Sequence, residues 1–112
     1  MTRKVIRSEA ADEDMLVIAD ELAASISMDA ALAVDERLDA AIESLAELSN
    51  RGRMVSELRA RGTTTYRELI VPPYYRIIYR VEEREVWIIA VLDHRRDLDV
   101  LLRERARRDR AP

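Results

Sequence analysis

The first half of the chain contains two stretches in which apolar residues recur every three or four positions. The first covers residues 9–26, and Ser8 stands directly before it as a candidate N-cap. The second follows a short break, where either Ser27 or Asp29 is placed to cap it. Because the break is so short, the pattern predicts two antiparallel helices that form a hairpin.

The remaining apolar positions favour strands. Residues 3–7 form a short β-branched segment ahead of the first helix, and residues 66–71, 74–81 and 86–92 are rich in β-formers. The last of these segments is apolar on both faces, which is typical of a central strand covered on both sides. Gly52 marks a break after the second helix, and residues 54–64, which contain Gly62, are interpreted as an irregular connection.

After the last strand, Asp97 is placed to cap a final helix. Its apolar face would hold Leu98, Leu101 and Leu102, with arginines gathered toward its C-terminal end, where the helix dipole favours cations. The predicted element order is β-α-α-β-β-β-α. This order indicates an α+β fold with the helical hairpin packed on a small twisted antiparallel sheet. We expect one domain over residues 1–112, with a flexible tail at about 107–112.

Composition narrows the function classes. The 112 residues include no Cys, one His and two Gly, so the sequence predicts no disulfide scaffold, no zinc site and no Gly-rich phosphate loop. The longest apolar run has seven residues, whereas roughly 20 are needed to span a bilayer. We therefore expect a cytoplasmic protein with no membrane partner, no metal and no cofactor.

Charge is divided unevenly along the chain. Residues 1–50 carry 4 basic and 12 acidic side chains (−8), and residues 51–112 carry 15 and 10 (+5), which gives the net charge of −3. Arginine supplies 18 of the 19 basic residues and suits bidentate contact with carboxylate or phosphate. The split suggests an acidic partner for the second half. A genomic bias toward arginine is the alternative explanation for the arginine content, and solvation explains the acidic helices.

Alternation along residues 74–81 predicts which side chains share a face. Ile77, Tyr79 and Val81 would point to the helix-covered core, and Arg76, Ile78 and Arg80 would form a basic face.

The turn at Pro72-Pro73 sets the register of the neighbouring strand. If the turn has two residues, Leu69 lies opposite Arg76, Arg67 lies opposite Ile78, and the two arginines share a face. A shift of one residue reverses this arrangement.

Metal-independent ribonuclease chemistry is one activity that such a face suggests. It needs a base, an acid and cations for the developing phosphate charge. Arg67, Arg76 and Arg95 would supply cations, while His94, Glu68 and Tyr79 are the nearby proton-transfer candidates. For His94, a role as a surface turn residue is the favoured alternative, since it is a lone histidine without visible partners. Glu68 and Tyr79 are expected to point toward the core, so the residues favour binding over catalysis.

Five segments in this order resemble the RelE/ParE superfamily of bacterial type II toxins. They include Tyr-Arg-Glu-Leu-Ile-Val, Tyr-Arg-Ile-Ile-Tyr-Arg-Val and Val-Trp-Ile-Ile-Ala-Val-Leu, and they span residues 51–58, 66–71, 75–81, 86–92 and 94–98. The resemblance covers roughly residues 3–102 and is closer to ParE-like members. It implies a helical hairpin on a twisted antiparallel sheet, and a toxin neutralised by a co-encoded antitoxin.

Two activities divide this superfamily, and the resemblance bears on each. RelE-type members cut messenger RNA on the ribosome, and Arg67, Arg76 and Arg95 fall near their cations. Leu69 and Leu101, however, occupy positions where ribonuclease members carry a basic residue and a tyrosine. The resemblance therefore implies a ParE-like toxin that inhibits DNA gyrase by binding. A RelE-like ribosome-dependent ribonuclease and a non-catalytic protein that only binds a partner are the alternatives.

The resemblance also implies what the antitoxin looks like. We expect a ribbon-helix-helix protein whose disordered C-terminal segment folds across the toxin. That segment would bring acidic residues to the arginine-rich surface and apolar anchors to the last helix. The candidate contact residues for the antitoxin or the target are Arg67, Arg76, Arg80, His94, Arg95, Arg96, Leu98, Leu101 and Leu102. Core packing is the alternative role of the three leucines.

Overall fold

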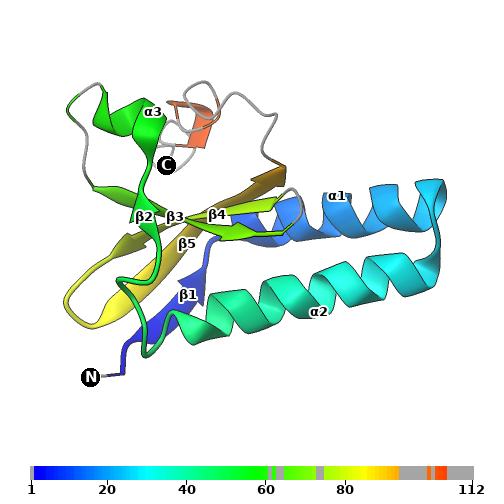
Figure 1. Cartoon of the computed structure of the whole chain (residues 1–112), viewed down its shortest axis with the longest axis horizontal. Coiled ribbons are helices and arrows are strands. Elements are labelled where there is room, and N and C mark those ends of the chain that lie inside the picture. Colours follow the sequence, from blue (N-terminus) through cyan, green and yellow to red (C-terminus); the bar gives the residue numbers. More distant parts are fainter. Residues whose placement is uncertain are drawn as a thin grey trace.

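A helical hairpin covers one face of a five-stranded sheet (Figure 1). The computed structural model describes residues 2–60, 62, 65–72, 75–93, 101 and 103–105. Leu101 and residues 103–105 are helical, and they follow the last strand. The predicted α+β class and the order of the predicted elements are confirmed.

Both long helices begin after a serine cap: Ser8, as predicted, for the first, and Ser27, one of the two predicted candidates, for the second. Helix α1 spans Glu9–Ser25, and the Ser8 side chain accepts a hydrogen bond of 3.0 Å from a backbone N–H of its first turn. Helix α2 spans Met28–Ser44 and is capped in the same way by Ser27, also at 3.0 Å. These bonds satisfy donors that a helix start leaves without partners.

The sheet has the order β1-β5-β4-β3-β2. Its strands are β1 (Lys4–Arg7), β2 (Arg53–Met54), β3 (Tyr66–Val71), β4 (Tyr75–Val81) and β5 (Glu85–Asp93). Strand β1 runs parallel to β5, and all other pairs are antiparallel. Strand β5 therefore lies inside the sheet between β1 and β4, as its apolar character predicted.

The prediction of an irregular connection over residues 54–64 is wrong for its first part. The chain forms β2, which pairs with β3, and then the short helix α3 (Ser56–Arg59). Val55 and Leu58 are buried against the sheet and hold this segment in place. Two apolar residues three positions apart give one turn of helix a buried side, a pattern too short for helical periodicity to register.

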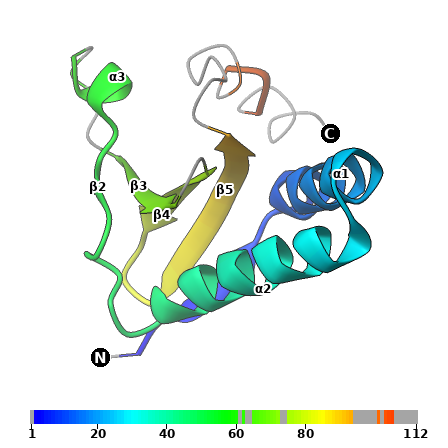
Figure 2. The ribbon, with the colours of Figure 1, turned by 45° about the vertical axis from the view of Figure 1, so that its right-hand side comes forward.

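Apolar cores lie on both faces of the sheet. The larger one fills the space between the hairpin and the sheet and includes Met15, Leu38, Ile77 and Tyr79. The second lies on the opposite face, where α3 sits (Figure 2), and includes Ile78, Ile89 and Leu92.

Leu101 is partly buried and packs against this second core, which is the alternative role considered for it. Leu98, Leu102 and the tail at 107–112 lie outside the described residues. Within the described part of the chain, no helix has the length and apolar character needed to cross a membrane.

Candidate functional site

The turn between β3 and β4 sets the geometry of the candidate site. Val71 pairs with Tyr75, so three residues separate the paired ends of the strands and not the two that the sequence analysis assumed. This difference shifts the register by one position, and Ile70 takes the place opposite Arg76 that was predicted for Leu69. A one-residue shift moves every side chain of a strand to the other face.

The shift separates the two arginines that were expected to lie together. Arg67 pairs with Tyr79 and shares its face, whereas Arg76 lies on the opposite face with Ile78. The prediction of a shared face is therefore wrong. Glu68, predicted to point toward the helix-covered core, instead lies on the face of Arg76. Tyr79 does point into the larger core, between the hairpin and the sheet, as predicted.

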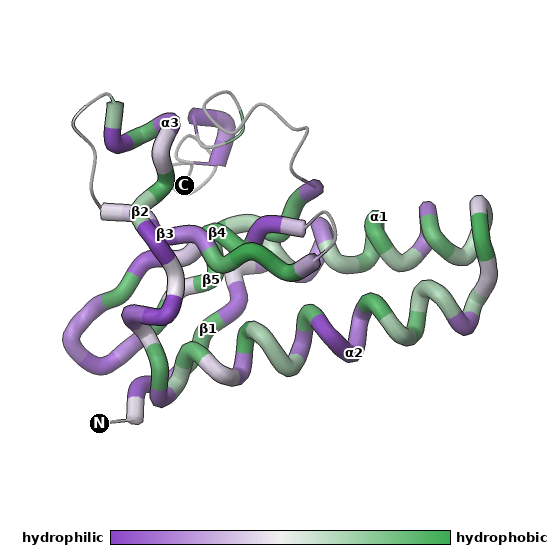
Figure 3. The backbone as a smooth tube through the Cα atoms, in the orientation of Figure 1, coloured by the Kyte–Doolittle hydropathy of each residue, from purple (hydrophilic) through white to green (hydrophobic). Residues whose placement is uncertain are grey.

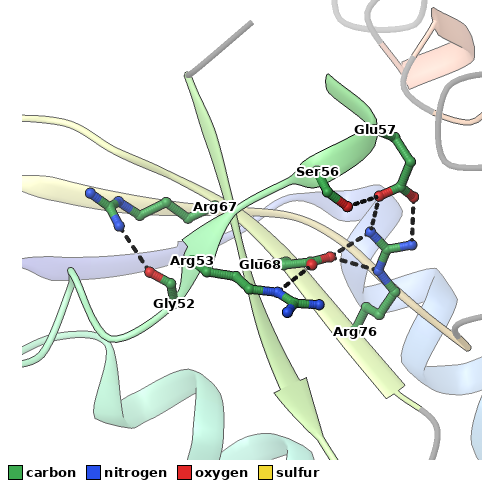
Figure 4. A network of polar contacts seen from close by, with 7 residues as sticks. All are labelled: Gly52, Arg53, Ser56, Glu57, Arg67, Glu68 and Arg76. Carbon is green, nitrogen blue, oxygen red and sulfur yellow. Dashed lines mark hydrogen bonds and ion pairs between the residues drawn. The ribbon is translucent and has the colours of Figure 1, made fainter. Parts of the chain in front are cut away.

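Arg76 is enclosed by two carboxylates (Figure 4). Its Nε donates to Glu68 at 2.7 Å, and its two terminal nitrogens donate to the two oxygens of Glu57 at 2.8 and 3.0 Å. The Arg76 side chain is only 8% exposed. The pair with Glu57 is the bidentate arrangement that guanidinium groups also make with phosphate.

Glu68 is the most deeply buried member of this group. Its side chain is 1% exposed, and it accepts hydrogen bonds from both Arg76 and the Nε of Arg53, the latter at 2.9 Å. We call Arg53, Glu57, Glu68 and Arg76 the charge cluster. Its two positive and two negative charges cancel, which is the condition under which ionised groups are tolerated in a protein interior.

Within the charge cluster, the environment shifts the pKa values of Glu57 and Arg76 in the directions that keep these two groups ionised. The hydrogen bonds from Arg76 lower the pKa of Glu57 from 4.5 to about 2, against the opposing effect of partial burial. Burial on its own would lower the pKa of Arg76, but the hydrogen bonds that Arg76 donates to Glu57 and Glu68, together with the attraction of their charges, outweigh it and raise the pKa. Both groups are therefore charged at neutral pH.

On the other face, Arg67 and Tyr79 fix the segment that precedes β2. Arg67 donates to the carbonyl oxygen of Gly52 at 2.8 Å. The Tyr79 hydroxyl accepts from the Gly52 N–H at 2.8 Å and donates to the Ser49 carbonyl at 2.9 Å. A Cβ atom on Gly52 would lie 2.5 Å from both the Glu68 carbonyl oxygen and the Tyr79 hydroxyl, so only glycine fits without a shift of the backbone.

Tyr79 is a poor candidate for proton transfer. Its side chain is buried in the larger core, and this burial raises the pKa of the hydroxyl. Arg80, the third arginine predicted on the strands, is paired with Glu82 through an Nε–Oε2 distance of 2.9 Å. Each of these three arginines, Arg67, Arg76 and Arg80, is thus held by a carboxylate or a carbonyl oxygen. Contact with phosphate through Arg76 would require displacement of Glu57.

Sequence reasoning missed the roles of Arg53 and Glu57 in this arrangement. Both lie in or beside the segment predicted to be irregular, and their contacts with Glu68 and Arg76 cross 15 and 19 positions. A count of three turn residues would have found the Glu68–Arg76 pair. His94, Arg95 and Arg96, the other predicted site residues, lie outside the described residues together with Leu98 and Leu102.

Comparison with known proteins adds to this geometry. Among solved structures, the chain is similar to one described as a chromosomal ParDE TA system from P. aeruginosa, with a TM-score of 0.69. The sequences are 17% identical, and the match covers 82% of this chain and 96% of the other, so the two share a fold. No curated protein sequence gives a significant match. Residues 5–98 match the family model described as the ParE toxin of type II toxin–antitoxin system, parDE. The chain belongs to this ParE toxin family.

Proposed function

We propose that this ParE-like toxin inhibits DNA gyrase by binding it, and that a cognate antitoxin neutralises the toxin. Membership of the ParE toxin family supports the toxin role, and the structural neighbour, described as a ParDE system, supports an antitoxin partner. The proposed target places the protein in the cytoplasm. The antitoxin is proposed to be a ribbon-helix-helix protein whose disordered C-terminal segment folds on the toxin.

The state of Arg76 is the observation that favours binding over RNA cleavage. A ribonuclease of this fold would need a cation free to meet the developing phosphate charge. Arg76 instead donates to both oxygens of Glu57 and to Glu68, and its guanidinium is almost fully buried. Exchanging these carboxylates for a phosphate would leave Glu68 as a buried charge with one partner fewer, which is costly.

The two candidate proton-transfer groups, Glu68 and Tyr79, also favour binding over RNA cleavage. Glu68 accepts hydrogen bonds from Arg53 and Arg76 through both of its carboxylate oxygens, and these bonds hold the side chain in place. The Tyr79 hydroxyl is buried between two backbone groups, where substrate has no access. Neither group is arranged for the acid–base work that cleavage next to a 2′-hydroxyl demands.

Two assays on the purified full chain test this proposal. The first measures supercoiling of relaxed plasmid by purified DNA gyrase, and the second measures messenger RNA cleavage in programmed ribosomes. We expect inhibition of supercoiling, relieved by an equimolar amount of the antitoxin encoded beside the toxin gene, and intact messenger RNA. Heat-denatured protein serves as the control in both assays.

The opposite pair of results would overturn the proposal. Cleavage of messenger RNA with supercoiling untouched would identify a RelE-like ribonuclease despite the paired state of Arg76. Inactivity in both assays, together with harmless expression in the absence of the antitoxin, would leave partner binding as the function. Either result removes gyrase as the target.

A further inference from the structure

A groove of about 420 Å³ runs along the hairpin between α1 and α2. Its apolar lining comes from both helices and includes Met15, Leu16, Ala19, Ala31 and Leu32. Met15 and Ala31 are buried, whereas Leu16 and Leu32 are 65% and 60% exposed. The groove therefore has a closed apolar base between two large exposed leucines, one from each helix.

The shape of the molecule explains why these leucines have no cover. The far half of the hairpin projects beyond the edge of the sheet (Figures 1 and 2), and apolar positions continue along both helices to that end (Figure 3). Met28, at the start of α2, also lines the groove and is 62% exposed. Contiguous apolar surface of this kind on a small protein marks a site of interaction.

The charge around the groove is strongly negative. Asp12 and Asp20 line it from α1, and Asp35 and Asp39 line it from α2. Arg7 is the only cation among the described lining residues, and it is paired with Asp39 at 2.5 Å. Over residues 9–44 the hairpin carries eleven carboxylates and one arginine, a charge of −10.

We propose that this groove docks a basic amphipathic helix of a partner protein. The apolar side of that helix covers Leu16 and Leu32, and its flanking lysines or arginines meet the aspartates of the rim. The lining residues of α2 extend from Met28 to Asp39, eleven residue steps of about 1.5 Å, or roughly 16 Å. A helix of about three turns fits this length.

The negative charge of the groove favours a basic helix over two other possible occupants, a second copy of this chain and the acidic antitoxin segment. A second copy of the hairpin would bring a further −10 against the same rim, which repulsion disfavours. The acidic antitoxin segment expected from the sequence would also be repelled here. The proposal depends only on the groove, so it stands or falls independently of the gyrase target.

A fluorescently labelled peptide is the probe that tests the groove directly. It is a 14-residue amidated helix with leucine at helical spacing on one side and lysine on the other positions. Fluorescence anisotropy with the full chain gives the Kd at low and at high salt. We expect saturable binding that weakens as salt rises, and no binding of a peptide with glutamate in place of each lysine or of a scrambled lysine peptide.

Paired variants locate the binding site by its charge. Asp20→Lys combined with Asp35→Lys reverses two rim charges, while Glu21→Lys with Glu36→Lys makes the same change one residue along each helix, outside the groove lining. We expect the rim variant to weaken binding about tenfold or more, and the control to retain most of its affinity. Equal affinities for the two variants would overturn the proposal.

A second matched pair tests the apolar contact. Leu16→Asp places a charge in the groove, and Val17→Asp places it on a neighbouring exposed residue that does not line the groove. Loss of roughly tenfold or more in affinity is expected for Leu16→Asp alone. Circular dichroism confirms that each variant is folded. If the unliganded chain forms a dimer that Leu16→Asp dissociates, a second copy covers the groove and the proposal is wrong.

Discussion

Because of the ion pair between Glu57 and Arg76, we expect the free energy of unfolding to vary with pH in the acid range. Replacing Glu57 with Gln removes the charge and keeps the size of the side chain. The pKa of this carboxyl falls from 4.5 to about 2. At about 1.4 kcal/mol for each pH unit, this fall corresponds to a ceiling of about 3 kcal/mol of stabilisation. The Glu57 side chain is 43% exposed, however, and solvent screens the interaction, so we expect a loss of about 1–2 kcal/mol at pH 7.

The sign of the pH dependence follows from the direction of the pKa change. A carboxyl whose pKa is lowered on folding contributes its full stabilisation above about pH 4.5, and loses it as the pH falls toward 2. Urea unfolding of the wild type and of Glu57→Gln should therefore give midpoints that differ at pH 7 and converge between pH 4.5 and 2. Glu36→Gln, which changes an exposed carboxylate of α2, serves as the control. Its urea midpoint should equal that of the wild type at neutral and at acid pH.

One outcome would refute this reasoning directly. If the difference in unfolding free energy between the wild type and Glu57→Gln were the same at pH 7 and at pH 2.5, the ion pair with Arg76 would not be its source. A difference near zero at both pH values would mean that α3 contributes through Val55 and Leu58 alone.

Urea unfolding at pH 7 tests three further changes. Tyr79→Phe should cost about 1–2 kcal/mol, since Gly52 loses a buried acceptor and Ser49 a buried donor; an unchanged midpoint would mean that water replaces the hydroxyl. Gly52→Ala should cost more than about 2 kcal/mol because its Cβ would lie 2.5 Å from the Glu68 carbonyl oxygen, and a neutral result would contradict the close approach. Ser8→Ala should cost about 1 kcal/mol through the lost N-cap of α1, and a cost near zero would show that the cap is dispensable.

The helices and the three main strands could be predicted because their determinants are local. Ser8 and Ser27 stand at the starts of stretches with helical spacing, and the side chain of each accepts the expected capping bond. The apolar character of residues 86–92 likewise predicted the interior position of β5, since a strand covered on both faces has no polar side.

The register and the charge cluster depend on contacts that local patterns do not encode. A single additional turn residue between Val71 and Tyr75 exchanges the faces of all β3 side chains, and composition does not determine turn length. The partner of Arg76 in α3 lies 19 positions away, in a segment with too few apolar residues to show periodicity. The sequence therefore identified Arg76 as a notable cation but not the carboxylates that enclose it.

The parallel pairing of β1 with β5 has a consequence for how the chain folds. Lys4 pairs with Glu85, which lies 81 positions later in the chain. Strand β1 can therefore pair only after β5 has been synthesised. The hairpin of α1 and α2 relies on short-range contacts and can form early, whereas the sheet closes only after β5 is complete. A nascent chain that ends before residue 85 lacks the strand on which both β1 and β4 pair. Hydrogen exchange during refolding should show the amides of β1 and β5 becoming protected together, in the final phase. A chain whose synthesis stops before β5 would therefore lack the toxin fold.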